Sequence, residues 1–235
     1  MNDRDIDDVL NRAAGSSPQV DPALVDRISQ SIGGTLRPVR PLPSLTVLAA
    51  AMMSICTAAA LLAGTVLGMH GIQKMGAAAS AFVFFALAIF MWIAALASCA
   101  QIIPGSRRYV APWILLVVIC LGMDAVFVWQ FDGLVTEQFV AQGIPCLATG
   151  LSIAIAVAAG CWSVLRRGLA VTPVTAGVAV GALAGLSGLA ALELHCPNLE
   201  IAHVLVWHTA IPLLGGVLGA VIGLLAAARH SRSPD

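Results

Sequence analysis

Six apolar stretches, each long enough to cross a lipid bilayer, constrain this chain more than any other feature of its sequence. A transmembrane helix needs roughly 20 mostly apolar residues to span about 30 Å of hydrocarbon. The stretches cover residues 45–69, 77–103, 113–131, 145–165, 174–194 and 204–228. Because 59% of the residues are hydrophobic and only 10% are charged, the sequence predicts an integral membrane protein.

The composition of these stretches also predicts their secondary structure. They are rich in Leu, Ala, Val, Ile and Gly, and they lack the polar alternation of a membrane barrel. Backbone groups in lipid must be paired within their own segment, so each stretch should be a helix. Because the connections are short, we expect an all-α membrane protein: a six-helix transmembrane bundle over residues 45–228 and a cytoplasmic tail over residues 229–235.

Arginines mark alternate ends of the six stretches and predict the orientation. They precede the first stretch, separate the second from the third and the fourth from the fifth, and follow the sixth: Arg27, Arg37, Arg40, Arg107, Arg108, Arg166, Arg167, Arg229 and Arg232. The opposite side has Lys74 as its only Lys or Arg. By the positive-inside rule, both termini should be cytoplasmic. Since topology alone requires these arginines, they give no reason to expect direct binding of nucleic acid.

Residues 1–44 form a cytoplasmic segment with a different pattern. Apolar residues recur at helical spacing in two short runs, separated by the helix-start signal Asp21-Pro22: Ile6, Val9 and Leu10, then Leu24, Val25, Ile28 and Ile32. The proline-rich sequence RPVRPLPS then predicts an extended tether. Helices this short are marginal in water, so the segment is either a disordered tail or a docking segment that folds on a partner.

Two of the six cysteines lie outside the membrane-embedded part of this layout and its inner edge. Cys146 begins the fourth stretch at its outer end, and Cys196 follows the fifth. In an oxidising compartment such as a bacterial periplasm, two such thiols can pair if their Cα atoms approach within about 7 Å. A disulfide between Cys146 and Cys196 is therefore one candidate state.

Histidines crowd the same side. His195, His203 and His208 lie near Cys196, and thiolate and imidazole are ligands of zinc, cadmium and copper. Together with both cysteines they predict a site that senses metal or redox change, with Cys146, Cys196 and His203 as the first candidate metal ligands. His203 and His208 are separated by about 140° on an α-helix, so both reach one ion only if the helix is distorted or begins there. A structural role for these histidines is the alternative.

Two acidic residues lie within the apolar stretches. Asp124 falls near the middle of the third stretch and Glu193 near the outer end of the fifth. A buried ionisable residue is costly in a membrane, so each should have a partner, and each is a candidate for a sensing or ion-relay role or for fixing helix packing. Repeated glycines in the fifth stretch predict close helix contacts instead: Gly177, Gly181, Gly185 and Gly188.

Two other functional classes are open from the residues alone. A thiol oxidoreductase could use Cys146 and Cys196, but the chain has no Cys-x-x-Cys pair. A small ion or metal transporter could use Asp124 and Glu193, but no inverted repeat is evident, although Pro212 interrupts the sixth stretch.

Several of these features together resemble the NrsF family of bacterial inner-membrane anti-sigma factors, named as negative regulators of sigma factor F. They are the helical leader ending in RPVRPLPS, the six spans with both ends inside, the outward Cys146, and the outward sequence Glu193-Leu-His-Cys-Pro-Asn followed by His203 and Trp207-His208. The resemblance covers nearly the whole chain.

The resemblance implies a non-enzymatic regulator in the bacterial inner membrane. Its N-terminal segment would sequester an extracytoplasmic-function sigma factor through the two apolar runs, and the outward cysteines would take part in releasing it under metal or oxidative stress. No permanent cofactor is expected; a transient soft-metal ion and the Cys146 to Cys196 disulfide are the two candidates. Metal binding or a thiol change would then shift the last three spans and weaken the hold on the sigma factor.

Overall fold

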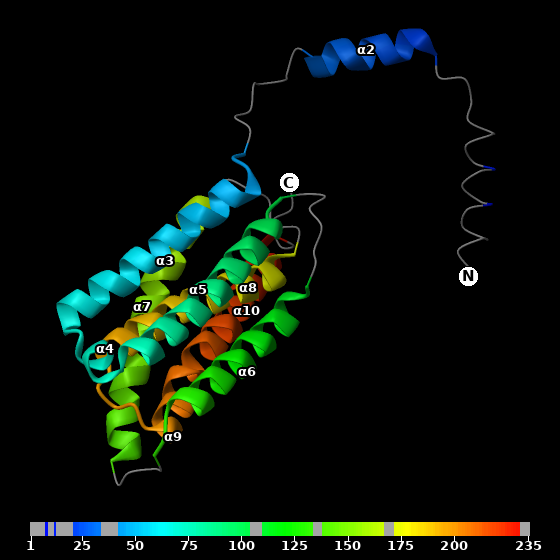
Figure 1. The fold of residues 1–235 in the computed structure, drawn as a ribbon. Helices are drawn as coiled ribbons and strands as arrows, with labels where there is room; N and C mark the ends of the chain where they lie inside the picture. The colour runs from blue at the N-terminus through cyan, green and yellow to red at the C-terminus, as the bar shows by residue number, and fades with distance from the viewer. Residues whose placement is uncertain are drawn as a thin grey trace. The chain divides into compact units, whose positions relative to one another are not determined.

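The computed structural model describes residues 8, 12, 21–33, 42–103, 110–133, 138–166 and 172–230, and every regular element among them is helical (Figure 1). The membrane helices are α3 (Leu45–Leu67), α5 (Ala77–Ala100), α6 (Pro112–Gln130), α7 (Phe139–Leu165), α8 (Pro173–His195) and a last helix built from α9 (Ile201–His203), the π-helical η1 (Val204–His208) and α10 (Ala210–His230). A short helix, α4 (His70–Lys74), joins α3 to α5. The prediction of six helices long and apolar enough to span a membrane is confirmed.

The fourth and sixth membrane helices begin earlier than the apolar pattern predicted. α7 starts at Phe139 and contains Pro145, which the sequence had placed at its beginning. A proline loses the hydrogen bond to the carbonyl four residues before it and its ring crowds that carbonyl, but the other hydrogen bonds of the first turns can still form. The sixth helix starts at Ile201 rather than at Val204. As a result, Cys146 and His203 both lie within helices.

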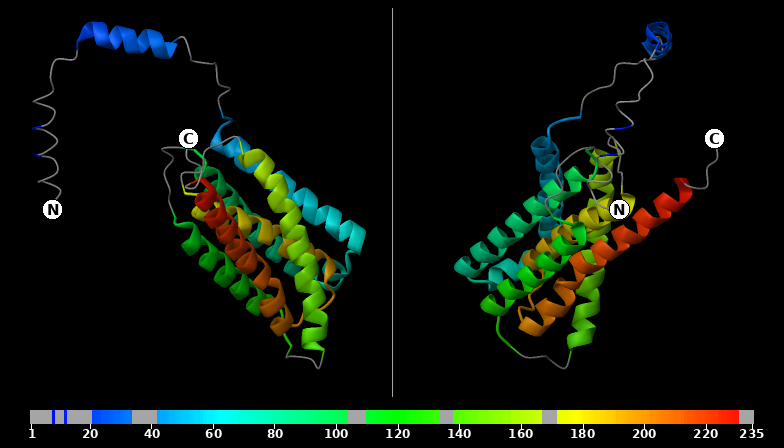
Figure 2. Two further views of the ribbon diagram at one scale, coloured as in Figure 1. Left: turned by 180° about the vertical axis from the view of Figure 1, so that it is seen from behind. Right: turned by 90° about the vertical axis from the view of Figure 1, so that its right-hand side faces the viewer.

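Helix α8 lies at the centre of the bundle. It packs against α3, α5, α6, α7 and α10, and the close pairing of α8 with α10 can be followed in Figure 2. Within its most apolar 18-residue window, 78% of the residues are buried, compared with 22% to 39% in the other five membrane helices. A residue on α8 is therefore surrounded by protein on nearly every side.

Glycines let α8 and α10 touch backbone to backbone. A Cβ atom on Gly181 would overlap the carbonyl oxygen of Gly215, and one on Gly177 would overlap that of Gly219. Only a residue without a side chain fits at such positions, which is the usual reason for small residues in membrane helix contacts. The predicted role of these glycines in helix packing is confirmed.

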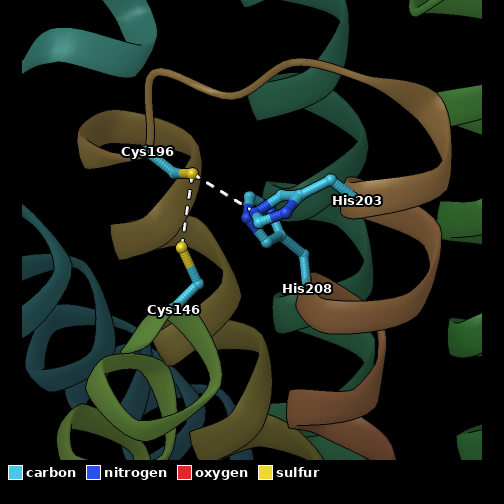
Figure 3. A group of neighbouring side chains, drawn as sticks. All are labelled: Cys146, Cys196, His203 and His208. Atoms are coloured by element: carbon cyan, nitrogen blue, oxygen red, sulfur yellow. Dashed lines mark hydrogen bonds between the residues drawn. The ribbon is translucent and has the colours of Figure 1, made fainter. Parts of the chain in front are cut away.

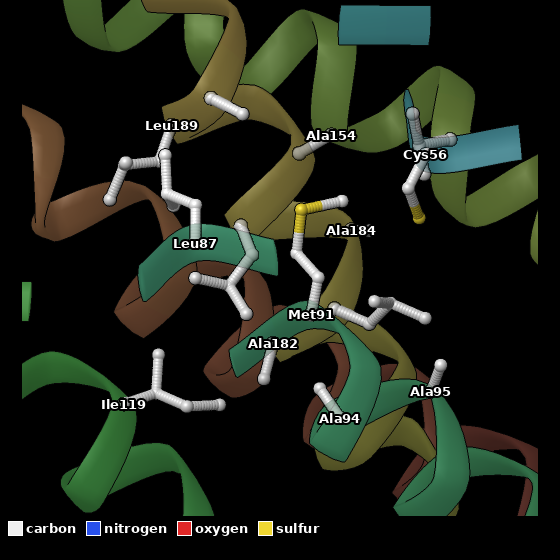
Figure 4. Packing of buried hydrophobic residues seen from close by; sticks show 14 of the residues in the cluster. Cys56, Leu87, Met91, Ala94, Ala95, Ile119, Ala154, Ala182, Ala184 and Leu189 are labelled. Carbon is white, nitrogen blue, oxygen red and sulfur yellow. The ribbon is translucent and has the colours of Figure 1, made fainter. Parts of the chain in front are cut away.

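Apolar side chains fill the inside of the bundle and also cover its outside. Inside, Leu87 and Met91 of α5 pack beside Leu189 of α8 (Figure 4). Outside, Val66 is 74% exposed and Ile222 is 67% exposed. A large apolar exterior is unfavourable in water but suits contact with lipid.

Residues Met1–Pro41 form a unit separate from Leu42–Asp235. Within it, α2 (Pro22–Gly33) begins where the sequence predicted, and the carboxylate of Asp21 accepts a hydrogen bond from the backbone N–H of Ala23 at 3.0 Å. This contact satisfies one of the free N–H groups at the helix start. The helix ends at Gly33.

Candidate metal and thiol site

Two thiols and two imidazoles meet at one end of the bundle (Figure 3). Cys146 lies on α7, Cys196 directly follows α8, and His203 and His208 lie in the first turns of the last helix. One sulfur or ring nitrogen from each residue lies within 4.8 Å of the other three. The structure therefore brings together four of the five residues that the sequence predicted for sensing; we call these four the Cys/His cluster.

A π-helical turn explains how both histidines reach the cluster. The backbone N–H of Thr209 bonds to the carbonyl of Val204, five residues earlier, at 3.3 Å. In a π-helix, residues five positions apart are joined across one turn, so His203 and His208 lie on the same side of the helix. Their ring centroids are 5.2 Å apart. Pro212 has no N–H to offer the carbonyl of His208, and this interrupts the α-helical hydrogen-bond pattern at the same place.

The two thiols are close together but not bonded. The Sγ atoms of Cys146 and Cys196 are 3.4 Å apart, and His203 Nε2 lies 3.5 Å from Cys196 Sγ. Both cysteines are free. The hydrogen bond with Cys146 and, to a lesser degree, burial raise the pKa of the Cys196 thiol, while the contact with His203 opposes them. Cys196 therefore holds its proton more firmly than an ordinary exposed cysteine.

Glu193 of α8 contacts the His208 ring at its Nδ1 atom. Its Oε1 atom lies 2.6 Å from His208 Nδ1, and both side chains are buried. A carboxylate accepts a hydrogen bond from the protonated ring nitrogen, so Nδ1 carries the proton when His208 is neutral. The opposite nitrogen, Nε2, then keeps its lone pair and is free to act as a ligand.

Buried polar atoms at the cluster lack hydrogen-bond partners among the described residues. They include His208 Nε2, His203 Nδ1 and Glu193 Oε2. A buried polar atom without a partner costs about 1–3 kcal/mol, so such atoms usually have a ligand, a water molecule or an ion to satisfy them. Two thiols and two imidazoles are also the donor set of structural zinc sites.

A groove with a volume of about 780 Å³ gives access to the cluster. Cys146, Cys196 and His203 all contribute to its wall. The remaining charged residues along it are Lys74, Asp132 and Glu200. A small ion or oxidant can therefore reach the thiols from outside the bundle.

Two predicted site residues lie elsewhere. His195 Nδ1 is 3.0 Å from the backbone oxygen of Gly68, and its ring faces His70, so it points away from the cluster. Asp124 on α6 accepts a 2.7 Å hydrogen bond from the hydroxyl group of Thr209. That contact joins α6 to the residue that follows the π-helical turn.

The sequence did not single out the residues that hold the loop between α8 and α9. The side-chain amide of Asn198 donates to Gln142 Oε1 on α7 at 2.8 Å, and its oxygen accepts from the backbone N–H of Glu200 at 3.0 Å. Asn commonly makes such turn contacts with the residue two positions further along the chain, so Asn198 itself was the sequence signal for its contact with Glu200. The contacts fix the loop that presents Cys196 beside Cys146.

Of the predicted partner surface, the structure describes three side chains, and all three lie on helix α2. Leu24, Val25 and Ile28 are 45%, 45% and 49% exposed. The remaining predicted contacts fall outside the described side chains: Ile6, Val9, Leu10 and Ile32. An exposed apolar face on a short helix is typical of a segment that docks on another protein.

Comparison with known proteins identifies a family model that matches most of the chain. The family model NrsF, described as negative regulator of sigma F, matches residues 34–227. This span contains the whole Cys/His cluster and begins directly after α2. No curated protein and no solved structure matches the chain.

Proposed function

This chain belongs to the NrsF family of negative regulators of sigma F, and we propose that it is a membrane-bound anti-sigma factor that sequesters an extracytoplasmic-function sigma factor. The observation that carries the proposal is the family match, which extends over most of the chain. Membership of a family of negative regulators also favours a regulatory role over a catalytic one.

The cytoplasmic N-terminal segment, residues 1–44, supplies the contact surface for the sigma factor in this proposal. Support comes from α2, whose exposed Leu24, Val25 and Ile28 are the apolar residues that a helix of 12 residues would bury on a partner. In this proposal, Ile32 and the earlier run of Ile6, Val9 and Leu10 would also contact the sigma factor. Covering part of the sigma factor in this way would keep it from RNA polymerase.

We assign the bundle to the bacterial inner membrane, with both termini in the cytoplasm. Support comes from the arginines at alternate helix ends, such as Arg166 after α7 and Arg229 at the end of α10. With this orientation, the opposite end of the bundle, which carries the Cys/His cluster, faces the periplasm. Disulfides form and persist in that compartment.

Cys146 and Cys196, together with His195, His203 and His208, are the proposed sensors of oxidative or metal stress. The separation of the two sulfur atoms, 3.4 Å, needs to shorten by about 1.4 Å for a disulfide. Hydrogen peroxide, as the oxidant, would accept one electron and one proton from each thiol and leave as two water molecules. The new S–S bond would join α7 directly to the end of α8.

Release of the sigma factor would follow from movement of the helices that the cluster connects. Cys146, Cys196 and His208 belong to α7, to the end of α8 and to the last helix, and the last two of these helices touch backbone to backbone. A coupling free energy of about 1–3 kcal/mol would change the affinity for the sigma factor roughly 5- to 150-fold. A modest rearrangement at the cluster is therefore sufficient.

Co-purification from detergent-solubilised membranes tests the proposed function. The full chain is compared with a version lacking residues 1–44, and bound soluble proteins are identified by mass spectrometry. We expect a sigma factor to be retained by the full chain only. Absence of any sigma factor from both samples would overturn the proposal.

A further inference from the structure

We propose that the Cys/His cluster binds one zinc-class divalent ion through four ligands, with His208 Nε2 as the fourth ligand and Glu193 as the residue that positions it. The regulatory consequence drawn below rests on the proposed function, whereas the binding site stands on the geometry of the cluster alone.

The distances within the cluster match a tetrahedral site. With Zn–S bonds of about 2.3 Å and Zn–N bonds of about 2.0 Å, neighbouring donor atoms lie about 3.3–3.8 Å apart. The two sulfur atoms are 3.4 Å apart, and Cys196 Sγ and His203 Nε2 are 3.5 Å apart. Because all four donor atoms lie within 4.8 Å of one another, no pair has to close by more than about 1.5 Å.

The donor types select the class of ion. Thiolate and imidazole bind Zn²⁺ and Cd²⁺ well, whereas Mg²⁺ and Ca²⁺ take oxygen ligands. Among the described residues, the four-atom group contains no carboxylate. We therefore expect selectivity for soft and borderline ions over hard ones.

Glu193 gives His208 the tautomer that a ligand needs. It accepts a hydrogen bond from Nδ1 at 2.6 Å, which leaves Nε2 of the neutral ring without a proton, and Nε2 is buried without a hydrogen-bond partner among the described residues. Metal-bound histidines usually donate their other N–H to a carboxylate or carbonyl, and this contact fixes the ring and raises its basicity. Glu193 and His208 form such a pair, on the side of the His208 ring away from the thiols.

Metal binding and disulfide formation would exclude each other, because both use Cys146 Sγ and Cys196 Sγ. A bound ion would join α7, the end of α8 and the last helix, whereas a disulfide would join only α7 and the end of α8. If the chain is an anti-sigma factor, the two signals would therefore hold its last three membrane helices in different arrangements.

Titration of the purified full chain with Co²⁺ tests the site. The protein is kept in detergent, reduced and free of metal before Co²⁺ is added. Co²⁺ is the probe because the four-coordinate ion with thiolate ligands absorbs visible light far more strongly than the six-coordinate ion. We expect one strongly absorbing ion per chain, displaced by Zn²⁺. Cys146→Ser, Cys196→Ser and His208→Ala should each lose or change the absorption, and Glu193→Gln should weaken binding about 10- to 100-fold with the same band pattern.

His70→Ala is the matched control, because His70 is exposed and belongs to no part of the cluster. It should leave both the spectrum and the affinity unchanged. A weak, six-coordinate spectrum for the unsubstituted chain, or an unchanged spectrum and affinity for His208→Ala, would overturn the proposal.

A second measurement needs no substitution. Alkylation of Cys146 and Cys196 in the unsubstituted chain should slow at least about tenfold when Zn²⁺ is added; equal rates with and without Zn²⁺ would also overturn the proposal. The experiments test the metal site and the anti-sigma function independently. A chain that binds Co²⁺ but retains no sigma factor contradicts only the proposed function, and the reverse result removes only the metal site.

Discussion

The Nδ1 atom of His208 lies 2.6 Å from the Oε1 atom of Glu193, and this contact joins the last membrane helix to α8. The His208 ring that reaches the two thiols is thus held by a carboxylate on the central helix of the bundle. Any shift between these two helices must change the position of the ring. The Cys/His cluster is therefore connected directly to helix packing.

Replacing His208 should destabilise the protein more than replacing Glu193. We predict that His208→Ala lowers the melting temperature of the metal-free protein in detergent more than Glu193→Gln does. Removing the imidazole leaves a buried carboxylate without a partner, a loss of about 3–5 kcal/mol for a buried pair. The double variant should recover part of that loss, and strictly additive effects would show that the two side chains are not coupled.

The contact between α8 and α10 should tolerate no added side chain. We predict that Gly181→Ala destabilises the bundle by about 1–3 kcal/mol, because the new methyl group would overlap the carbonyl oxygen of Gly215. Gly76→Ala is the control, since nothing lies within 4 Å of the added atom. Thermal unfolding in detergent measures both, and equal melting temperatures would contradict the packing described here.

The hydrogen bond between Thr209 and Asp124 should contribute to stability. Thr209→Val removes the donor, and we predict a loss of about 0.5–1.5 kcal/mol. Thr65→Val is the matched control, because the hydroxyl group of Thr65 donates to the carbonyl of Leu62 within its own helix. If both variants melt at the same temperature, the contact between α6 and the last helix has no measurable role in packing.

Loss of both cluster cysteines should abolish signalling without preventing membrane insertion. We predict that Cys146→Ser/Cys196→Ser removes the response of a sigma-dependent reporter to Cd²⁺ or peroxide, while membrane fractionation still recovers the protein. The control is Cys99→Ser/Cys120→Ser, since both of these cysteines lie in membrane helices away from the cluster. A normal response in the cluster variant would remove the sensing role.

Most of the fold could be predicted because its signals are local. The length and apolar content of each stretch identified the helices, and the spacing of Gly177 and Gly181 identified a close helix contact. The exact helix starts were harder to predict. Pro145 was expected to begin a helix, but a proline near the end of a helix disturbs too few hydrogen bonds to stop it.

The arrangement of the cluster could be predicted only in part. Cys146 and Cys196 are 50 residues apart, and their pairing followed from expecting both at one end of the bundle. The close approach of His203 and His208 depends on a π-helical turn, which α-helical spacing cannot reveal. The contact between Glu193 and His208 depends on how two helices are rotated against each other, and the sequence of neither helix specifies that rotation.

The most direct test of the central claim is the affinity of the full chain for the sigma factor that co-purifies with it. Ile28→Asp places a charge in the exposed apolar face of α2, whereas Gln30→Asp adds the same charge to an exposed position outside that face. The account predicts that Ile28→Asp weakens binding at least about tenfold and that Gln30→Asp changes it by less than about twofold. Equal affinities for the two variants would contradict the claim that this segment sequesters the sigma factor.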